Sequence, residues 1–359
     1  MRTVRALSLT LLLIMTSLSL MISPSSAVDT SLNSDTTWSG DIVLTGNVTV
    51  LPDTTLTLQP GTTVDGGDGH WIHVEGTLFA EHSEFFSSHA PLTQGSHGAG
   101  LWTGLQISQT GHAILDNTTI NNSKTGIKVD GSLTATTLSI NDAYIGMNII
   151  GSATVDDLHA EHIDYDVIRN SGTLNLFSGV FTDVAGGIWS TGTSVVEGMT
   201  VSNVGTALRS SGGSLTANGL NFHQATVGLS SSEGASTDIS DISGDNISLF
   251  IDASNSDDLT VENAAISGTR LLVGNGVQSI SLQDIDFHHT ATSSLAAVDL
   301  RCTVACDWTN LSIVNATSGL ILSGQGSHSL VDSSIQVLQR AIEATGYGHL
   351  TLDAVQISA

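Results

Sequence analysis

Carboxylates next to glycine or histidine are the residues of this chain with the most direct catalytic potential. The segment Asp65-Gly-Gly-Asp68-Gly-His70 combines two carboxylates with an imidazole, and paired carboxylates occur at Asp156/Asp157, Asp164/Asp166 and Asp257/Asp258. Paired carboxylates can act as a general acid and a general base. These sets, however, lie in stretches typical of turns, where Asp binds the local backbone. We therefore predict no catalytic residue among them.

Histidines form the second group of candidates, since imidazole and carboxylate ligands bind zinc or copper. They occur at His70, His73, His82, His89 and His97, in His159-Ala-Glu161-His162, and at His288-His289. No cysteine or methionine cluster accompanies them. The pattern favours exposed turn histidines, and we predict no metal site and no cofactor.

Cys302 and Cys306 are the two cysteines of the chain. In an exported protein a disulfide is the usual state. An extended segment would hold their Cα atoms more than about 10 Å apart, so a bridge requires a turn between them. The sequence leaves both states open. Glycosylation sequons, another modification signal of exported proteins, occur at Asn47, Asn117, Asn121, Asn246, Asn310 and Asn315.

The segment 1–27 is typical of a removable export signal. Arg2 and Arg5 precede an apolar stretch over residues 6–22, and small residues allow cleavage after Ala27. That stretch is short and contains five Ser and Thr residues, which argues against a membrane span. We expect a secreted or cell-surface protein, without membrane insertion in this segment.

The remaining chain is strongly acidic. Nine Lys and Arg residues stand against 34 Asp and Glu residues, and without Arg2 and Arg5 the net charge is −27. This charge argues against nucleic acid and anionic membranes as partners.

A short repeat organises the chain from position 104 onward. In each copy a small or apolar residue precedes a triplet that is apolar at its first and, in about half of the copies, its third position. Twelve copies start between positions 104 and 341, so their eleven intervals average about 21.5 positions. They begin at Gly104, Gly126, Gly146, Val167, Gly187, Ala207, Gly228, Leu249, Leu271, Ala297, Gly319 and Ala341.

One copy, residues 126–145, shows three short alternating pieces separated by turn residues: Ile127/Val129, Leu133/Ala135 and Leu138/Ile140. Alternation with period two predicts half-buried strands. Three strands per repeat without a helix predict a parallel β-helix, in which each strand pairs with its copy one coil later. We also expect Asn121 and Asn141, which follow the third strand of consecutive coils, to stack as an amide ladder.

The predicted domain division has three parts. Segment 1–27 is the signal, segment 28–37 is an irregular lead-in, and segment 38–359 is a single β-helix domain with one repeat per coil. The last residues still show strand alternation, Leu350-Thr-Leu-Asp-Ala-Val-Gln-Ile357. Because an open coil presents unpaired strand edges, we expect the domain to be truncated at its C-terminal end.

Four motifs near the start resemble the opening of right-handed parallel β-helix proteins of microbial surfaces, in the pectate-lyase-like superfamily. They are NVTV at 47–50, TLTLQPGTTV at 55–64, IHVEGTLFA at 72–80 and LWTGLQI at 101–107, with Leu58 and Leu105 where the family pattern has Ile. The resemblance implies the fold but no single activity, because lyases, hydrolases, adhesins and periplasmic metal-handling proteins share it. Neither the family's calcium-binding Asp cluster with an Arg base nor its Asp pair with Gly-His-Gly is present.

The middle residues of the triplets form a column that should face outward: Gln106, Lys128, Asn148, Arg169, Trp189, Arg209 and Ser230. Lys128, Arg169 and Arg209 are three of the seven basic residues after the signal. Guanidinium groups bind carboxylate or sulfate in bidentate fashion, and an indole offers a flat face to a sugar. We take Lys128, Arg169, Trp189 and Arg209 as candidate ligand-binding residues for an anionic polysaccharide. The alternative is that these cations merely interrupt an exposed sheet face.

Farther along, the column reads Ile251, Val273, Asp299 and Ile321. Exposed β-branched residues suggest that another segment or a partner covers this face. A local register shift explains the pattern equally well.

These observations predict a secreted or cell-surface, non-catalytic scaffold that binds polysaccharide or another cell-surface component and mediates attachment. A polysaccharide lyase or glycoside hydrolase of the same fold is the alternative, and a periplasmic metal-handling protein is a third hypothesis.

Overall fold

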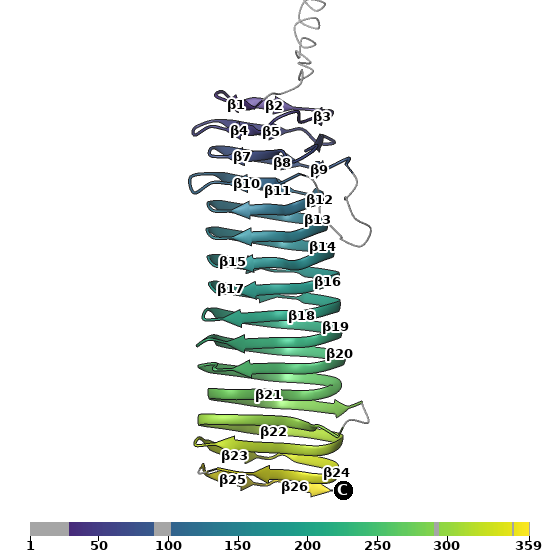
Figure 1. Ribbon diagram of the computed structural model, residues 1–359, viewed down its shortest axis with the longest axis vertical. Coiled ribbons are helices and arrows are strands. Elements are labelled where there is room, and N and C mark those ends of the chain that lie inside the picture. Colours follow the sequence, from purple (N-terminus) through teal and green to yellow (C-terminus); the bar gives the residue numbers. More distant parts are fainter. Residues whose placement is uncertain (1–28, 90–101, 291–293, 347, 359) are drawn as a thin grey trace, which may run out of the picture.

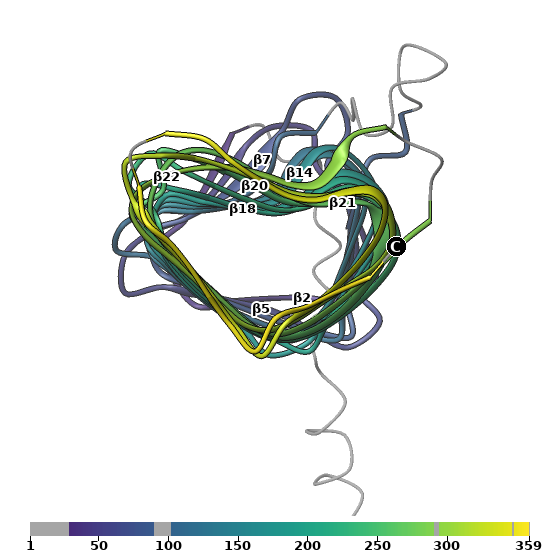
Figure 2. The same ribbon diagram turned by 90° about the horizontal axis from the view of Figure 1, so that it is seen from below.

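The structure, a computed structural model, describes residues 29–89, 102–290, 294–346 and 348–358. The predicted export signal and His97 lie outside the described residues. The described residues form 26 β-strands, and no helix long and apolar enough to cross a membrane is found among them. The strands coil into a right-handed parallel β-helix of about 15 turns (Figures 1 and 2). The fold predicted from the repeat is confirmed.

The first three coils consist of three short strands each. These strands are β1 Thr30–Leu32, β2 Thr36–Trp38, β3 Asp41–Val43, β4 Val48–Val50, β5 Thr55–Leu58, β6 Thr63–Asp65, β7 Trp71–Val74, β8 Thr77–Glu81 and β9 Glu84–Phe86. Many of the later strands are longer. They are β10 Gly104–Ile107, β11 His112–Asp116, β12 Thr118–Val129, β13 Ser132–Ile149, β14 Ser152–Asn170, β15 Thr173–Leu176, β16 Gly179–Ser190, β17 Thr193–Glu197, β18 Met199–Ser211, β19 Ser214–Ser232, β20 Ser236–Ser254, β21 Asp258–His289, β22 Ala296–Gly324, β23 Ser327–Val331, β24 Ser334–Ala344, β25 Leu350–Asp353 and β26 Gln356–Ser358.

Each coil has three faces, which we name by one coil, β13. Face B contains Leu133 and Ala135, face C contains Leu138 and Ile140, and face A contains Met147. Parallel pairing joins each face to the same face of the next coil. In face A the predicted triplets pair in an unbroken series, and all their first residues are buried: Leu105, Ile127, Met147, Ile168, Ile188, Leu208 and Leu229.

Several long strands pass through two or more faces, whereas the alternation predicts separate pieces. The corner between faces C and A shows why. It turns at one residue in the left-handed conformation, as at Asn122 (φ 54°), Asp142 (φ 52°) and Asn203 (φ 53°). Asn and Asp tolerate this conformation better than other non-glycine residues. A single such residue bends the chain while strand pairing continues on both sides.

Amide side chains stack at two of the corners. The Nδ2 of Asn141 donates to the Oδ1 of Asn121 at 3.1 Å, which confirms the predicted ladder. At the corner between faces B and C, Asn263 donates to Asp241 at 2.5 Å and Asn310 donates to Asp284 at 2.7 Å. These Asn donors lower the pKa of both carboxyl groups. Alternation of Asn with Asp therefore keeps like charges from stacking directly on one another.

In five successive coils the corner between faces A and B is lined by a glycine: Gly131, Gly151, Gly172, Gly192 and Gly213. A Cβ atom at Gly172 would lie 2.1 Å from the carbonyl oxygen of Gly151, and the others meet the preceding coil at similar distances. The coils approach one another too closely here for any side chain. Glycine is therefore required by close backbone contact.

The N-terminal boundary differs from the prediction. The segment 28–37, expected to be irregular, contains β1, which pairs with β4, and the start of β2, which pairs with β5, both in parallel. The first coil therefore begins within this segment. Three-residue strands are too short to show a clear alternation in sequence.

The two cysteines are joined by a disulfide across the corner between faces A and B. Cys302 and Cys306 have their Cα atoms 6.4 Å apart, within bridging reach. The turn required by the sequence argument is present. Register shifts occur at the same corner of the neighbouring coil, between Asn275 and Ser279.

Candidate functional site

The candidate ligand-binding residues lie on five successive coils of face A. Lys128 pairs with Asn148, Asn148 with Arg169, Arg169 with Trp189, and Trp189 with Arg209. With a strand separation of about 4.8 Å, the row extends over roughly 19 Å. Parallel stacking therefore brings together side chains that lie one full repeat apart in sequence.

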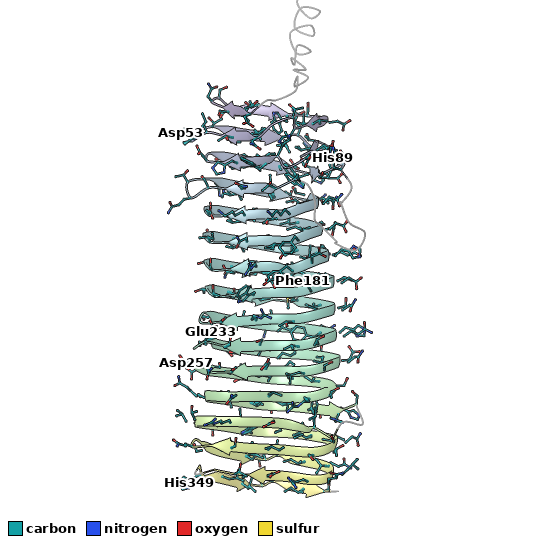
Figure 3. The ribbon with its side chains drawn as sticks, in the orientation of Figure 1. Asp53, His89, Phe181, Glu233, Asp257 and His349 are labelled. Atoms are coloured by element: carbon teal, nitrogen blue, oxygen red, sulfur yellow. A yellow bond between two sulfur atoms is a disulfide. The ribbon has the colours of Figure 1, made fainter. Side chains whose placement is uncertain are left out.

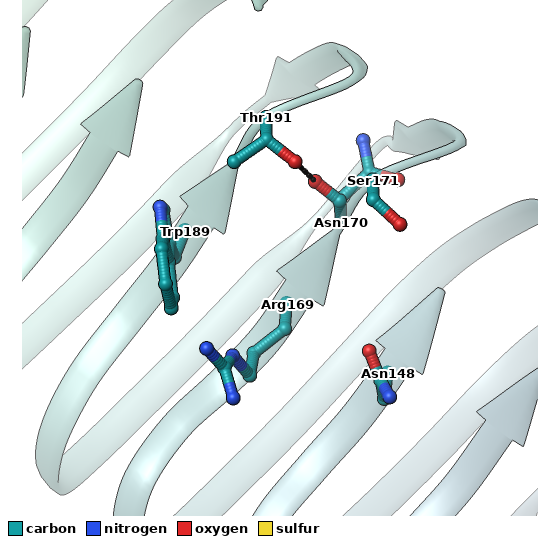
Figure 4. A pocket seen from close by; sticks show the side chains of 6 residues that line it. All are labelled: Asn148, Arg169, Asn170, Ser171, Trp189 and Thr191. Atoms are coloured by element: carbon teal, nitrogen blue, oxygen red, sulfur yellow. Dashed lines mark hydrogen bonds between the residues drawn. The ribbon is translucent and has the colours of Figure 1, made fainter. Parts of the chain in front are cut away.

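Trp189 stands between two arginines. The Cζ of Arg169 lies 4.3 Å from the indole ring, and the Cζ of Arg209 lies 5.7 Å from it. In Figure 4 the indole is seen on edge, with the guanidinium of Arg169 beside it. The indole was expected to offer a flat face to a sugar; in the structure, guanidinium groups from the coils on either side approach that ring. Cation–π attraction instead holds the two guanidinium groups in place.

Two tyrosines extend this stack. The Tyr165 ring lies 5.1 Å from the Cζ of Arg169, and it stacks on Tyr144 at 5.7 Å between centroids. Both tyrosines are exposed. They belong to the beginning of face A, just after the corner with face C. Sequence analysis missed them because they precede the repeating triplet.

Lys128 is separate from this cluster. Its Nζ lies 2.7 Å from the Oδ2 of Asp130, and Asn148 lies between it and Arg169. The ammonium group is therefore paired with the residue that follows the end of its own strand. The cluster proper contains Tyr144, Tyr165, Arg169, Trp189 and Arg209, and we call it the arginine–aromatic cluster.

Asp166 lies beneath this cluster. Its interpretation from sequence as a solvated turn residue is wrong, because Asp166 is only 8% exposed. Its Oδ2 lies 3.5 Å from the Nε of Arg169 and has no hydrogen-bond donor. Burial raises the pKa of the Asp166 carboxyl, although Arg169 and Arg209 act in the opposite direction. One residue in the sequence is consistent with the burial of Asp166. Its register partner in the next coil is Gly186, where a Cβ would lie 2.3 Å from the Asp166 Oδ1.

Two shallow hollows flank the stack. One, of about 200 Å³, is lined by Asn148, Arg169, Asn170, Ser171, Trp189 and Thr191 (Figure 4). The other, of about 190 Å³, is lined by Tyr165, Asp166, Ala185, Gly186, Ile188, Thr206 and Arg209. The first lies at the end of the face A strands and the second at their beginning. A ligand that fills both therefore crosses the stack along the strand direction.

Beyond Arg209 the outward column mixes polar and apolar residues: Val273 and Ile321 are partly exposed, whereas Asp252 takes the outward position expected for Ile251. Ser230 pairs with Asp252, Asp252 with Val273, and Val273 with Asp299. Ile251, expected to point outward, is buried and pairs with Leu229. The repeat start at position 249 is therefore misplaced by one position. The register shift that the sequence left open is the explanation at this coil.

The other sequence candidates serve the local backbone or lie on the surface. The Oδ1 of Asp65 accepts hydrogen bonds from the amides of Gly67 and Ser88. Burial acts to raise the pKa of Asp65, but these hydrogen bonds lower it overall. Asp157 lies 3.1 Å from the exposed His159. One exposed group, Glu161 with His162 and Asp183, has its ligand atoms within 4.8 Å of one another.

Sequons lie at exposed positions Asn117, Asn246, Asn310 and Asn315, whereas Asn47 and Asn121 are partly buried. Glycosylation at any of them stays a prediction.

Comparisons with known proteins find similarity of fold only. No family model matches the chain, and no curated protein does. The catalytic unit of an α-1,3-glucanase from Streptomyces thermodiastaticus is 13% identical, with a TM-score of 0.37 over 89% of this chain and 62% of that unit. The surface adhesin PfbA of Streptococcus pneumoniae is 9% identical, with a TM-score of 0.35 over 91% and 92% of the two chains. The enzymatically active domain of tailspike protein 2 of bacteriophage CBA120 is 12% identical, with a TM-score of 0.28 over 89% and 48%.

This chain spans less than two thirds of the glucanase unit. These three neighbours are two enzymes and an adhesin, and they do not distinguish binding from catalysis.

Proposed function

We propose that this protein is an exported, non-catalytic scaffold that binds an anionic polysaccharide at the arginine–aromatic cluster. The observation that carries the proposal is the pair of guanidinium groups held on either side of Trp189. Arg169 and Arg209 lie two coils apart, about 10 Å at the usual strand spacing. Their remaining N–H groups can bind carboxylate or sulfate groups on an extended chain.

Local charge supports an anionic ligand. The two hollows are lined by two arginines and one carboxylate, Asp166, on a chain whose overall charge is strongly negative. Burial raises the pKa of Asp166, so its opposing charge is lost at a higher pH than that of an ordinary aspartate. The exposed rings of Tyr144 and Tyr165 provide apolar surface for sugar rings beside the cations.

The lining of the hollows also favours binding over hydrolysis. Glycoside hydrolases generally use two carboxyl groups placed about 5–9.5 Å apart across the bond. The two hollows contain one carboxyl group between them. Asp166 could supply an acid, but no second carboxylate lines the hollows to complete the pair.

The test compares binding of uronic-acid and sulfated polysaccharides by the parent protein and by Arg169→Ala/Arg209→Ala. We expect the double variant to lose binding and the parent's affinity to fall with added salt, because exposed charges are screened within about one Debye length. The matched control, Arg301→Ala/Arg340→Ala, removes the same charge from exposed sites outside the cluster and should bind as the parent does.

Equal binding by the double variant and the parent would contradict the proposal. New reducing ends or unsaturated products in the same incubations would show an enzyme. Trp189→Ala should weaken binding with little change in salt dependence, since the indole carries no charge.

A further inference from the structure

A buried histidine lies against the disulfide. His328 pairs with Cys306 in the inward column of face B, one coil farther along. Both positions are buried, and the preceding coil places the buried Ile280 in the same column. A ring nitrogen of His328 and the Sγ atoms of Cys302 and Cys306 all lie within 4.8 Å of one another, and all three residues are buried.

His328 fits poorly as a purely structural residue. It is 5% exposed, its Nδ1 has no hydrogen-bond partner, and its Nε2 lies 3.4 Å from the carbonyl oxygen of Ser323. Because a carbonyl only accepts, Nε2 carries the proton and Nδ1 has a free lone pair. An unpaired buried polar atom costs about 1–3 kcal/mol. The column accepts isoleucine, so core packing gives no reason for histidine here.

The same features suit a metal ligand. Burial lowers the pKa of His328, which favours the neutral ring that binds metals. The contact from Nε2 to Ser323 is the kind of outer hydrogen bond that orients a ligating imidazole. A small hollow of about 100 Å³ includes His328, Leu322, Gly324 and His349 in its lining and offers an entry path. In Figure 3, His349 marks this end of the solenoid.

We propose that Cys302, Cys306 and His328 form a redox-gated site for a thiophilic metal cation such as Zn²⁺. The disulfide keeps the site closed. A dithiol reductant supplies two electrons and two protons, becoming a disulfide itself, and leaves two thiols. Binding the cation then displaces both thiol protons, so two thiolates and one imidazole surround a divalent ion.

Geometry and charge are compatible with this step. Tetrahedral zinc, with bonds of about 2.3 Å to sulfur, places two thiolates about 3.8 Å apart, so the ligands need only small movements. Two thiolates neutralise a divalent cation, and a neutral centre is tolerated in an apolar interior. Any side chain at position 326 would crowd the sulfur, since a Cβ there would lie 2.9 Å from the Cys302 Sγ, and Gly326 avoids this contact.

The experiment uses the full chain produced under oxidising and under reducing conditions, with the thiol count determined by mass after alkylation. Co²⁺ serves as a spectroscopic probe, and Zn²⁺ affinity is measured by competition with a chromophoric chelator. All proteins also carry His162→Ala, which disrupts the exposed Glu161–His162–Asp183 group. Circular dichroism checks the fold of each form.

We expect the reduced protein to bind one equivalent of Co²⁺ and to show thiolate-to-cobalt charge-transfer absorption. The oxidised protein should bind no Co²⁺. His328→Leu should lower the affinity of the reduced form at least about tenfold, while His159→Ala, an exposed histidine outside the hollow, should not change it. The proposal requires that the reduced protein binds the metal. If the reduced chain binds none, whether circular dichroism shows it folded or unfolded, the proposal is overturned. Equal affinity of His328→Leu and the parent would overturn it as well.

Discussion

Asp166 is held in a position that disfavours its charged form. Burial raises its pKa above the ordinary 3.8, and the nearby Arg169 and Arg209 only partly offset this effect. A carboxyl group with a raised folded-state pKa stabilises the fold below its unfolded pKa. This contribution is lost as the pH rises through the folded-state pKa.

Replacement of Asp166 by Asn should reveal this dependence. We expect the free energy of unfolding of the parent, minus that of Asp166→Asn, to decrease from pH 3.5 to pH 7, since only the parent ionises at this site. Urea unfolding at a series of pH values measures the difference. A difference that does not vary with pH would show that Asp166 titrates as an ordinary exposed carboxyl.

The same contact changes the expectation for Arg169. As an exposed residue it would be expected to tolerate replacement with a stability change below about 0.5 kcal/mol. In the structure its Nε lies 3.5 Å from the buried Asp166. Arg169→Ala should therefore destabilise the fold at neutral pH more than Arg209→Ala does. Thermal melts must accompany every binding measurement on these variants.

At the scale of the element, the glycine corner between faces A and B controls how closely coils can stack. Gly172→Ala would place a Cβ atom 2.1 Å from the Gly151 carbonyl oxygen. Because backbone cannot move aside as a flexible side chain does, we expect a destabilisation of about 1–3 kcal/mol, as for other overpacked sites.

Urea unfolding of Gly172→Ala provides the measurement, and Thr173→Ala is the matched control. Thr173 is the next residue, is exposed, and begins β15. An alanine at 172 that is as well tolerated as one at 173 would mean that the coils separate easily at this corner.

Across the whole molecule, added salt should change the stability of the fold and its affinity for an anionic polysaccharide in opposite directions. A chain with a charge of −27 after the predicted signal repels itself more when compact than when unfolded. Raising ionic strength from 0.01 to 0.15 M shortens the Debye length from about 30 Å to about 8 Å. We expect the melting temperature to rise over this range.

Glycan affinity should fall over the same range, because the arginine–aromatic cluster attracts the opposite charge. Calorimetric melts and binding titrations in one buffer series separate the two effects. If stability also falls with salt, attraction among ion pairs rather than overall repulsion dominates the fold.

The sequence by itself determined the architecture, because alternation and period are local properties of the chain. Alternating apolar residues and a regular repeat period were sufficient to predict the parallel coils, the face A triplets and the Asn121–Asn141 ladder. The row from Lys128 to Arg209 followed from the same period, since parallel register aligns residues one coil apart.

Only the tertiary structure decided what these side chains do. The period leaves the register uncertain by one residue, and such an error reverses a side chain's direction; this is what happened at Ile251. The sandwich around Trp189, the burial of Asp166 and the meeting of His328 with the cysteines depend on rotamers and corner geometry. These are set by contacts between coils, which no local pattern in the sequence records.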